Sequence, residues 1–526
     1  MTLDAGQYLA LCETCDRVLL APDATIERVA IPWLHVIREH PVFLQSYADE
    51  ARGSSRAVAR SGRALRRQAS KWRQLWRAAR SDGLPWHTAG LPESVDVLFV
   101  SHLLNAAQAG QAEDFYFGTL ADELCDRGRP AALALLNHSG QPSHDLASRW
   151  LGDVAPRAVL SASLALPQER ALRRRLLNES RRLEQLVGGA ANGLERSVWS
   201  RAAAEALSGA ALATLRISEQ VGALVAKLRP SAIVVTHEGH AWERVVFAAA
   251  RRSRPGIRCI GYQHAALFKL QHAVRRNLLG VYNPDRIVAA GEVGAAQLAG
   301  APRLPGTPVA VLGSSRARKA SAAESRSALA AAAMCAGKAT TCLVLPEGIP
   351  AECHLLFEFS LECARACPDM SFVWRLHPIV SFESLLERNE KLRNRPPNVK
   401  LSTRAFADDL AVAGWALYRG STAIIQAVAE QVRPVYVQVP GEMTVDPLYE
   451  LEGFRERVTT AADFMHVVRS AHERVECDDG GAADAARAYC AAMYVPFNVE
   501  VLLEAISPAV SSEIAGPSTR LHGMVS

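Results

Sequence analysis

Short apolar segments alternate with helical segments from about residue 95 onward, and this alternation constrains the fold more than any other feature. The apolar segments lie at 95–104, 131–139, 157–165, 231–239 and 257–265, and then at 286–291, 308–315, 340–348, 370–378, 398–402, 415–422 and 433–442. Strands that alternate with helices favour a parallel sheet covered on both faces. The sequence therefore predicts an α/β fold with two doubly wound, Rossmann-like domains, 91–285 and 286–505, and a cleft between them.

The segments outside these domains differ in composition. Residues 1–90 read as a helical N-terminal segment, and its stretch 51–80 contains ten Arg or Lys and no acid, with Trp72 and Trp76 among the arginines. Such a stretch fits either the anionic face of a membrane or a solvated arginine face packed on the next domain, and the two interpretations are equally supported. Residues 507–526 read as a flexible tail.

Composition excludes several classes of protein. The chain has 526 residues, of which 49% are hydrophobic and 21% charged, and its net charge of +5 is too small to indicate nucleic acid as a partner. We find no apolar run of membrane-spanning length, and Asp4 in the first residues makes a poor signal peptide. Eleven cysteines without a repeated pattern suit reduced thiols. We expect a cytoplasmic protein, with peripheral contact at the inner face of the inner membrane if 51–80 binds lipid.

Three strand ends of the second predicted domain carry residues suited to an anion. A strand that ends in His-Pro or in Gly-Ser-Thr offers an imidazole, hydroxyl groups and free backbone N–H groups, which together suit a phosphate. The candidate donor-binding residues are Glu347, Gly348, Arg375, His377, Pro378, Gly420, Ser421 and Thr422. Neither GxGxxG nor GxxxxGK[ST] occurs, so nicotinamide-dinucleotide and P-loop chemistry lack their usual motifs.

Two adjacent strand ends of the first predicted domain carry titratable residues. The segments "VVTHEGHAWER" and "GYQHA" place carboxylates and imidazoles where a general base could face the phosphate site across the cleft. The candidate catalytic residues are Glu238, His237 and His240, and the candidate acceptor or cleft residues are Gln263, His264 and Glu243. Which of the three catalytic candidates is the base stays open.

Together these elements resemble a known family. "DFYFGTL", "THEGHAWERVVFAAAR", "GYQHA", "LPEG", "RLHP" and "RGSTAIIQAV" are similar to surface carbohydrate biosynthesis proteins of GT-B fold, and more distantly to bacterial sialyltransferases and CMP-Kdo transferases. The resemblance implies that Glu238 deprotonates the acceptor hydroxyl and that His377, with Ser421 and Thr422, binds the donor phosphate. The family's pair of acids before glycine is here His237–Glu238.

The expected function is a GT-B glycosyltransferase that moves a nonulosonic acid or Kdo-type sugar from a CMP-activated donor to a surface-glycan, lipid-linked or protein acceptor. We expect no cofactor and no metal, because a single leaving phosphate can be stabilised by a histidine and hydroxyl groups and no D-x-D motif occurs. Two alternatives remain: a CDP-glycerol-type polymer phosphotransferase, and a non-catalytic GT-B-like protein that binds nucleotide sugars. The sequence does not specify the sugar, the acceptor, the stereochemical outcome or the oligomeric state.

Overall fold

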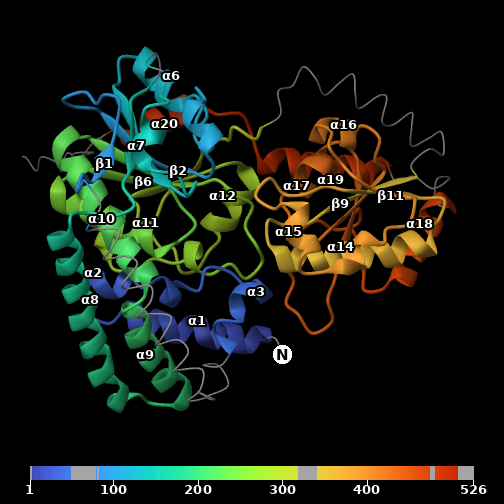
Figure 1. Ribbon diagram of the computed structural model, residues 1–526, viewed down its shortest axis with the longest axis horizontal. Coiled ribbons are helices and arrows are strands. Elements are labelled where there is room, and N and C mark those ends of the chain that lie inside the picture. Colours follow the sequence, from blue (N-terminus) through green and yellow to red (C-terminus); the bar gives the residue numbers. More distant parts are fainter. Residues whose placement is uncertain are drawn as a thin grey trace, which may run out of the picture.

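The protein consists of two α/β lobes, and the N-terminal helices pack beneath the first of them (Figure 1). The computed structural model describes residues 3–48, 79, 82–150, 152, 155–317, 340–473 and 480–507. The predicted basic stretch 51–80, apart from residue 79, and the predicted tail after Ser507 lie outside the described residues. Membrane contact through 51–80 therefore stays a prediction.

The first lobe is built on an eight-stranded sheet with the order β1-β4-β3-β2-β5-β6-β7-β8. Only β1 is antiparallel to its neighbour, and the apolar side chains of β2, β3 and β5 are buried on both faces, as a covered parallel sheet requires. The strands are β1 (Trp86–His87), β2 (Val97–Leu103), β3 (Ala131–Asn137), β4 (Arg157–Leu160), β5 (Ala232–Thr236), β6 (Arg258–Gln263), β7 (Arg286–Ala289) and β8 (Val309–Val311).

Helices cover both faces of this sheet. One face packs on α10 and α11, and the opposite face packs on α6 and α20. The helices of this lobe are α6 (Leu120–Asp126), α7 (Ser143–Ala147), α8 (Leu166–Leu186), α9 (Gly193–Ala206), α10 (Gly209–Leu228), α11 (Ala241–Ser253) and α12 (Glu292–Ala299), with 3-10 turns η2 (Ala106–Gly110), η3 (Val187–Gly189), η4 (Ala273–Arg275) and η5 (Gly280–Tyr282).

The second lobe has a six-stranded, wholly parallel sheet with the order β11-β10-β9-β12-β13-β14. Its strands are β9 (Thr341–Leu345), β10 (Ser371–Trp374), β11 (Val399–Leu401), β12 (Trp415–Tyr418), β13 (Arg433–Val437) and β14 (Glu456–Val458). Its helices are α14 (Pro350–Ala366), α15 (Phe382–Leu386), η7 (Glu390–Arg393), α16 (Phe406–Leu410), α17 (Ala423–Ala429), α18 (Ala461–Glu473) and α19 (Gly480–Met493).

The predicted boundary between the domains at 285/286 is wrong by two strands. β7 pairs with β6, and β8 pairs with β7, so the first sheet continues to Val311. The chain also returns to the first lobe at its C-terminal end, because α20 (Val499–Ile506) packs in the core of that lobe beside α6 (Figure 1). The range 286–505 is therefore shared between the lobes. An apolar run identifies a strand but does not say which sheet the strand joins.

The first part of the N-terminal segment is helical, as predicted, and it packs on the first lobe, whereas Trp86–His87, which fall within the predicted helical segment 1–90, form β1 of the first sheet. It contains α1 (Ala5–Leu19), α2 (Ile26–Val29), η1 (Pro32–His35) and α3 (Pro41–Leu44). Tyr8, Leu11, Val18 and Leu34 are fully buried in one apolar core with α8, α9 and α10. No helix in the described part of the chain is both long and apolar enough to span a bilayer.

The strand orders locate the functional region. Among the parallel strands of each sheet the order along the chain reverses once, between β2 and β5 in the first lobe and between β9 and β12 in the second. Ligands of open parallel sheets bind outside the carboxyl ends of strands at such a switch point. This is the arrangement of two Rossmann-like domains expected for a GT-B-like fold, with a switch point in each lobe.

Candidate functional site

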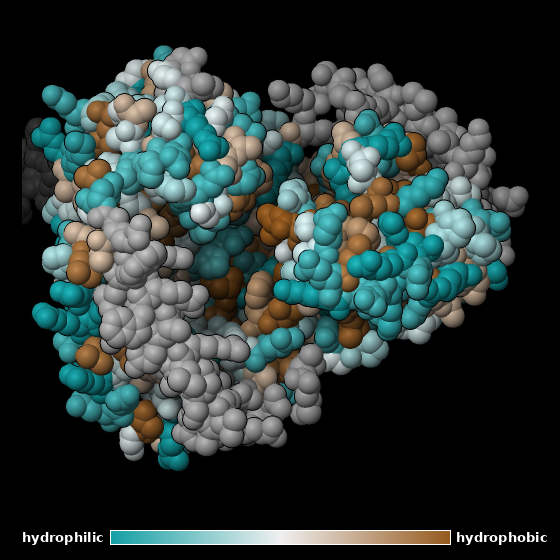
Figure 2. Space-filling model, viewed as in Figure 1, coloured by the Kyte–Doolittle hydropathy of each residue, from teal (hydrophilic) through white to brown (hydrophobic). Residues whose placement is uncertain are grey.

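A cavity of about 1110 Å³ lies between the lobes, and its wall is made by both switch points and by the N-terminal segment. Figure 2 shows the hollow between the lobes, with hydrophilic and hydrophobic residues side by side in its wall. The lining residues include Trp33, Arg38, Phe43 and Tyr47 of the N-terminal segment, Phe115, Glu238, His240 and Arg316 of the first lobe, and Arg375, His377, Ser421 and Thr422 of the second.

All eight candidate donor-binding residues line this cavity. They converge because β10, β9 and β12 are neighbours in the sheet, so the three loops that follow these strands leave the same edge together. Glu347 and Gly348 follow β9, the Arg375–Pro378 loop follows β10, and the Gly420–Thr422 turn follows β12. The residues selected from the three sequence patterns thus form one continuous part of the cavity wall.

His377 is placed to donate a hydrogen bond into the cavity. Its Nδ1 accepts the backbone N–H of Ile379 at 3.4 Å, which leaves the proton on Nε2. Burial lowers the pKa of His377, so the ring is neutral near pH 7. Gly348 allows this approach, because a Cβ at that position would lie 2.8 Å from Nδ1 of His377.

Arg375 also faces the cavity, but its charge is already compensated. Its Nη1 donates to Oδ2 of Asp409 at 2.8 Å and to the backbone carbonyl of Arg404 at 2.9 Å. Asp409 lies in the first turn of α16 and is buried, and the guanidinium lies 4.9 Å from the ring of Phe406. Arg375 therefore serves mainly to join β10 to α16.

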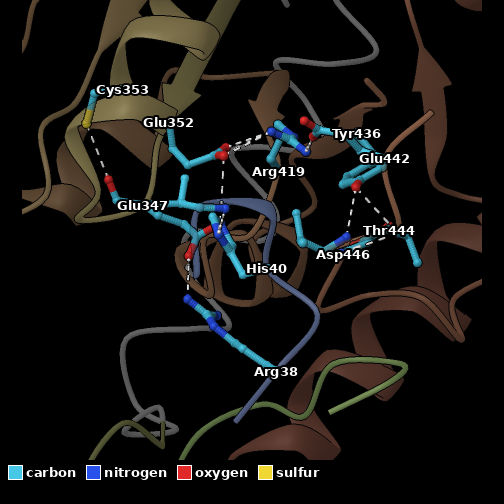
Figure 3. A network of polar contacts seen from close by, with 12 residues as sticks. Arg38, His40, Glu347, Glu352, Cys353, Arg419, Tyr436, Glu442, Thr444 and Asp446 are labelled. Carbon is cyan, nitrogen blue, oxygen red and sulfur yellow. Dashed lines mark hydrogen bonds and ion pairs between the residues drawn. The ribbon is translucent and has the colours of Figure 1, made fainter. Parts of the chain in front are cut away.

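Glu347 lies at the second switch point and contacts the turn after β12. A side chain at Gly420 would overlap with Oε1 of Glu347, so only glycine leaves room for the carboxylate. Arg38 donates to Oε2 at 3.0 Å, and His40 lies 3.1 Å from Oε1 (Figure 3). Burial alone would raise the pKa of Glu347, but His40 and Arg38 lower it, so the carboxylate is ionised.

On the first lobe, Glu238 and His240 reach the cavity directly after β5. Nε2 of His240 lies 3.4 Å from Oε2 of Glu238. Burial opposes both charges, but the pair lowers the pKa of Glu238 well below its usual range and raises the pKa of His240. Each side chain thus favours the charged form of the other, and the two make an ion pair at the cavity wall.

His237 and Glu243 do not line the cavity, contrary to expectation. The His237 side chain is fully buried, and its Nδ1 lies 3.0 Å from Glu243. The carboxylate of Glu243 accepts the backbone N–H groups of Glu238, Gly239 and His240 at 2.7–3.1 Å. Glu243 thus holds the loop that presents Glu238, and His237 packs behind it, so only Glu238 and His240 of the three catalytic candidates can touch a substrate here.

Gln263 and His264 are likewise outside the cavity wall. Gln263 is buried and donates to the backbone carbonyl of Ala265. His264 packs 4.4 Å from the ring of Tyr116, and burial lowers its pKa to about 4. It belongs to a group of neutral rings at this sheet edge, where Nδ1 of His102 lies 2.9 Å from Nε2 of His138 and burial lowers the pKa of His102 to about 3.

Several cavity residues were not predicted. Arg316 follows β8 in "VLGSSRAR", a strand end of the same kind as those recognised elsewhere, so a signal existed. Within the described residues it has no carboxylate at ion-pair distance. Trp33, Arg38 and Phe43 lie in "PWLHVIREHPVF", whose bordering prolines mark an irregular segment. Nothing in that pattern indicates contact with a domain 300 residues away in the chain.

One group in the described part of the chain has the composition of a metal site: His40, Glu347 and Glu352. Nδ1 of His40 accepts the backbone N–H of Val42, so Nε2 carries the proton and is not available as a metal ligand. Glu352 accepts both its bonds from Arg419 at 3.0 Å, and Arg419 also donates to Glu442 (Figure 3). These residues form a complete ion-pair network by themselves, which fits a structural role.

No protein-family model matches the sequence, and no curated protein matches it. Solved structures do. MurG of Acinetobacter baumannii is 13% identical over 79% of this chain and 99% of its own, with a TM-score of 0.43. The UDP-GlcNAc 2-epimerase of Neisseria meningitidis is 13% identical over 78% and 99%, with a TM-score of 0.42. The glycotransferase of kitacinnamycin is 15% identical over 80% and 100%, with a TM-score of 0.44. These identities are too low to imply a shared substrate.

Proposed function

We propose that this protein is a metal-independent glycosyltransferase that uses a CMP-activated donor, of the nonulosonic acid or Kdo type, and transfers the sugar to a hydroxyl group of a surface-glycan, lipid-linked or protein acceptor. The observation that carries the proposal is the juxtaposition of two different strand-end sites in one cavity. Glu238 and His240 face it from the first lobe, and His377, Ser421 and Thr422 face it from the second.

The second-lobe site suits the leaving group. As the bond between the anomeric carbon and the phosphate oxygen breaks, the electron pair stays on CMP and charge grows on its phosphate. The Nε2–H of His377, the hydroxyls of Ser421 and Thr422, and the backbone N–H groups of their turn can stabilise that charge. Because α17 has only seven residues, these local groups rather than a long helix would supply the stabilisation.

The first-lobe site suits the nucleophile. An acceptor hydroxyl must lose its proton as its oxygen bonds to the anomeric carbon, and Glu238 is ionised and partly exposed to receive it. His240 is the other candidate for this role, since it also lines the cavity. In the ion pair, protonated His240 would orient the Glu238 carboxylate rather than accept the proton.

The charges of the cavity favour a donor with one phosphate. Before a donor binds, Arg375 is engaged by Asp409 and Arg38 by Glu347, which leaves Arg316 as the lining arginine without a carboxylate partner among the described residues. The lining acids Glu238 and Glu347 are each held by cationic or imidazole partners. No pair of free carboxylates is left among the described lining residues to hold a divalent ion on a diphosphate. A nucleoside monophosphate leaving group, as in a CMP-sugar, requires fewer positive charges.

Nucleotide binding and product analysis test this proposal. We expect CMP to raise the melting temperature and to bind more tightly than CDP, UDP or GDP in the absence of divalent ions. We then expect CMP release coupled to sugar transfer when a CMP-nonulosonate or CMP-Kdo donor is offered with bacterial surface glycans. CMP release with a phosphodiester product would instead identify a polymer phosphotransferase. Failure of every nucleotide to bind would overturn the proposal in favour of a non-catalytic module.

A further inference from the structure

We infer that Arg38, on the N-terminal segment, is a donor-binding residue that Glu347 holds in place until the donor arrives. This inference rests on the proposed donor site. It adds a third component to that site, because neither lobe contributes Arg38 and the family motifs do not include it. Four observations carry it.

The first observation is proximity. Arg38 donates through Nη2 to Oε2 of Glu347 at 3.0 Å, and the other oxygen of the same carboxylate lies against Gly420. The guanidinium is therefore separated from the Gly420–Thr422 turn by a single carboxylate group. An anion bound at that turn would lie beside Glu347 and within reach of a small movement of the Arg38 side chain.

The second observation is that the Glu347 carboxylate would keep a hydrogen-bond partner if Arg38 moved away from it. His40 is fully buried, and its Nε2–H stays 3.1 Å from Oε1 of Glu347, whereas the Arg38 side chain is 19% exposed. The neighbouring Glu352 is satisfied separately by Arg419. Glu347 would thus keep His40 as a partner, and the partner that it would lose, Arg38, is the one that lines the cavity.

The third observation is the support beneath Arg38. The guanidinium carbon lies 4.7 Å from the centre of the Phe268 ring and 5.1 Å from that of Phe43, so two aromatic rings support the cation. Within the described residues only its Nη2 has a hydrogen-bond acceptor. The remaining N–H groups of the fork are available to a phosphate, which guanidinium binds well.

The fourth observation concerns the residues on either side of Arg38 in the chain. The carbonyl of Ile37 accepts the N–H of His272 at 3.3 Å, and Oε1 of Glu39 accepts the N–H of Leu270 at 2.6 Å, so both neighbours of Arg38 are fixed to the first lobe. A phosphate seated on the second lobe and bound by Arg38 would therefore take the place of Glu347 as the group that joins Arg38 to that lobe.

Glu347 then acts as an internal anion that competes with the donor phosphate. Removal of its charge should strengthen nucleotide binding, because Arg38 no longer has to break an ion pair. A residue that contacted the nucleotide directly would show the opposite sign. This difference in sign separates the inference from the simpler view that Glu347 is itself a donor ligand.

The test is calorimetric titration of the full chain with the best-bound nucleotide of the CMP, CDP, UDP and GDP panel. We expect Arg38→Gln to weaken binding by about tenfold, the loss of one charge-assisted hydrogen bond. Arg38→Lys should fall between Arg38→Gln and the unmodified protein, because lysine keeps the charge but not the fork. Glu347→Gln, which keeps the shape and can still accept hydrogen bonds, should strengthen binding by about threefold, the scale of a partly exposed ion pair.

Two controls carry the same charge changes elsewhere. Arg17→Gln alters an arginine of α1 that contacts Thr14, and Glu358→Gln alters a half-exposed acid of α14 that pairs with Lys391; neither residue lines the cavity. Both controls should bind nucleotide like the unmodified protein.

Unchanged affinity in Arg38→Gln, or weaker binding in Glu347→Gln, would overturn the inference while leaving the proposed function standing. If Arg38→Gln does not fold, the affinities of Arg38→Lys and Glu347→Gln decide. If the unmodified protein binds no nucleotide, the proposed function fails, and the inference fails with it.

Discussion

The two switch points of this molecule have the same topology and opposite chemistry. The first, between β2 and β5, carries several histidines. Burial keeps the imidazoles of His102 and His264 neutral, and beside them lies the ion pair Glu238–His240. The second, between β9 and β12, is built from glycines and hydroxyl groups around His377. In the proposed function, one edge takes a proton and the other holds an anion. The shared topology places both edges at one cavity, and the side chains at each edge determine its chemistry.

The largest effect should come from Glu238 and His240 of the first lobe, which we call the proton-accepting side. Glu238→Gln keeps the shape of the side chain but cannot accept a proton, so transfer should fall by about 10²–10⁴-fold while nucleotide affinity changes little. Turnover and calorimetric affinity measured on the same preparation check this. His240→Gln should cost less turnover than Glu238→Gln if the carboxylate is the base, and the reverse order would assign that role to His240.

Glu292→Gln is the matched control for that prediction. Glu292 is an exposed acid at the start of α12, on the same lobe, and it does not line the cavity. It should retain full transfer. A loss of nucleotide affinity in Glu238→Gln as large as its loss of turnover would contradict the division between the two edges.

The next largest effect should come from His377 and the Gly420–Thr422 turn of the second lobe, which we call the anion side. His377→Ala removes the Nε2–H donor and should weaken CMP binding by about ten- to a hundredfold, for a loss of roughly 1.5–3 kcal/mol. The fold should survive, because the side chain is exposed to the cavity and fills no core. His466→Ala, an exposed histidine of α18, is the control. Unaltered CMP affinity in His377→Ala would place the phosphate elsewhere.

Sequence patterns predicted which second-lobe residues line the cavity better than they predicted the first-lobe lining residues. Glu347, His377 and Ser421 each follow a strand within a few residues, so parallel topology alone brings them to one edge. On the first lobe the same rule correctly selected the loop after β5. It could not say that Glu243 would turn inward to bind three backbone N–H groups, because that depends on the local path of the loop.

The remaining differences are long-range. The apolar runs of β7 and β8 are typical of any parallel strand, and only their pairing with β6 assigns them to the first sheet. Arg38 reaches Glu347 across 309 positions of sequence, and no periodicity in a helical segment encodes such a contact. The sequence thus predicted two lobes and a cleft, but not the N-terminal segment that bridges them.

A smaller effect should follow from substitution of a glycine on the anion side. Gly420→Ala places a methyl group where Oε1 of Glu347 lies, so the carboxylate must move and its pairing with Arg38 and His40 is disturbed. We expect a loss of about 1–3 kcal/mol in the free energy of unfolding, measured by urea denaturation. Gly481→Ala, in α19 with open space around it, should be neutral or slightly stabilising. Equal stability of the two variants would show that Glu347 does not depend on this contact.

The smallest effect should be the pH dependence of the ion pair on the proton-accepting side. The pKa of His240 is raised in the fold, so its stabilising contribution is complete below the unfolded pKa of about 6.5 and is lost as the pH rises through the folded value. The pKa of Glu238 is lowered, so its contribution is complete above about pH 4.5 and is lost only in stronger acid.

The difference in melting temperature between the unmodified protein and His240→Gln should therefore be greatest at about pH 5–6 and shrink toward pH 9. Because the two side chains are 39% and 29% exposed, solvent screening should limit it to about 1–3 °C. His466→Gln, at an exposed histidine of α18 that does not line the cavity, is the matched control. A difference for His240→Gln that grew toward high pH would mean that the imidazole is neutral in the fold, and the Glu238 carboxylate would then act without a cationic neighbour.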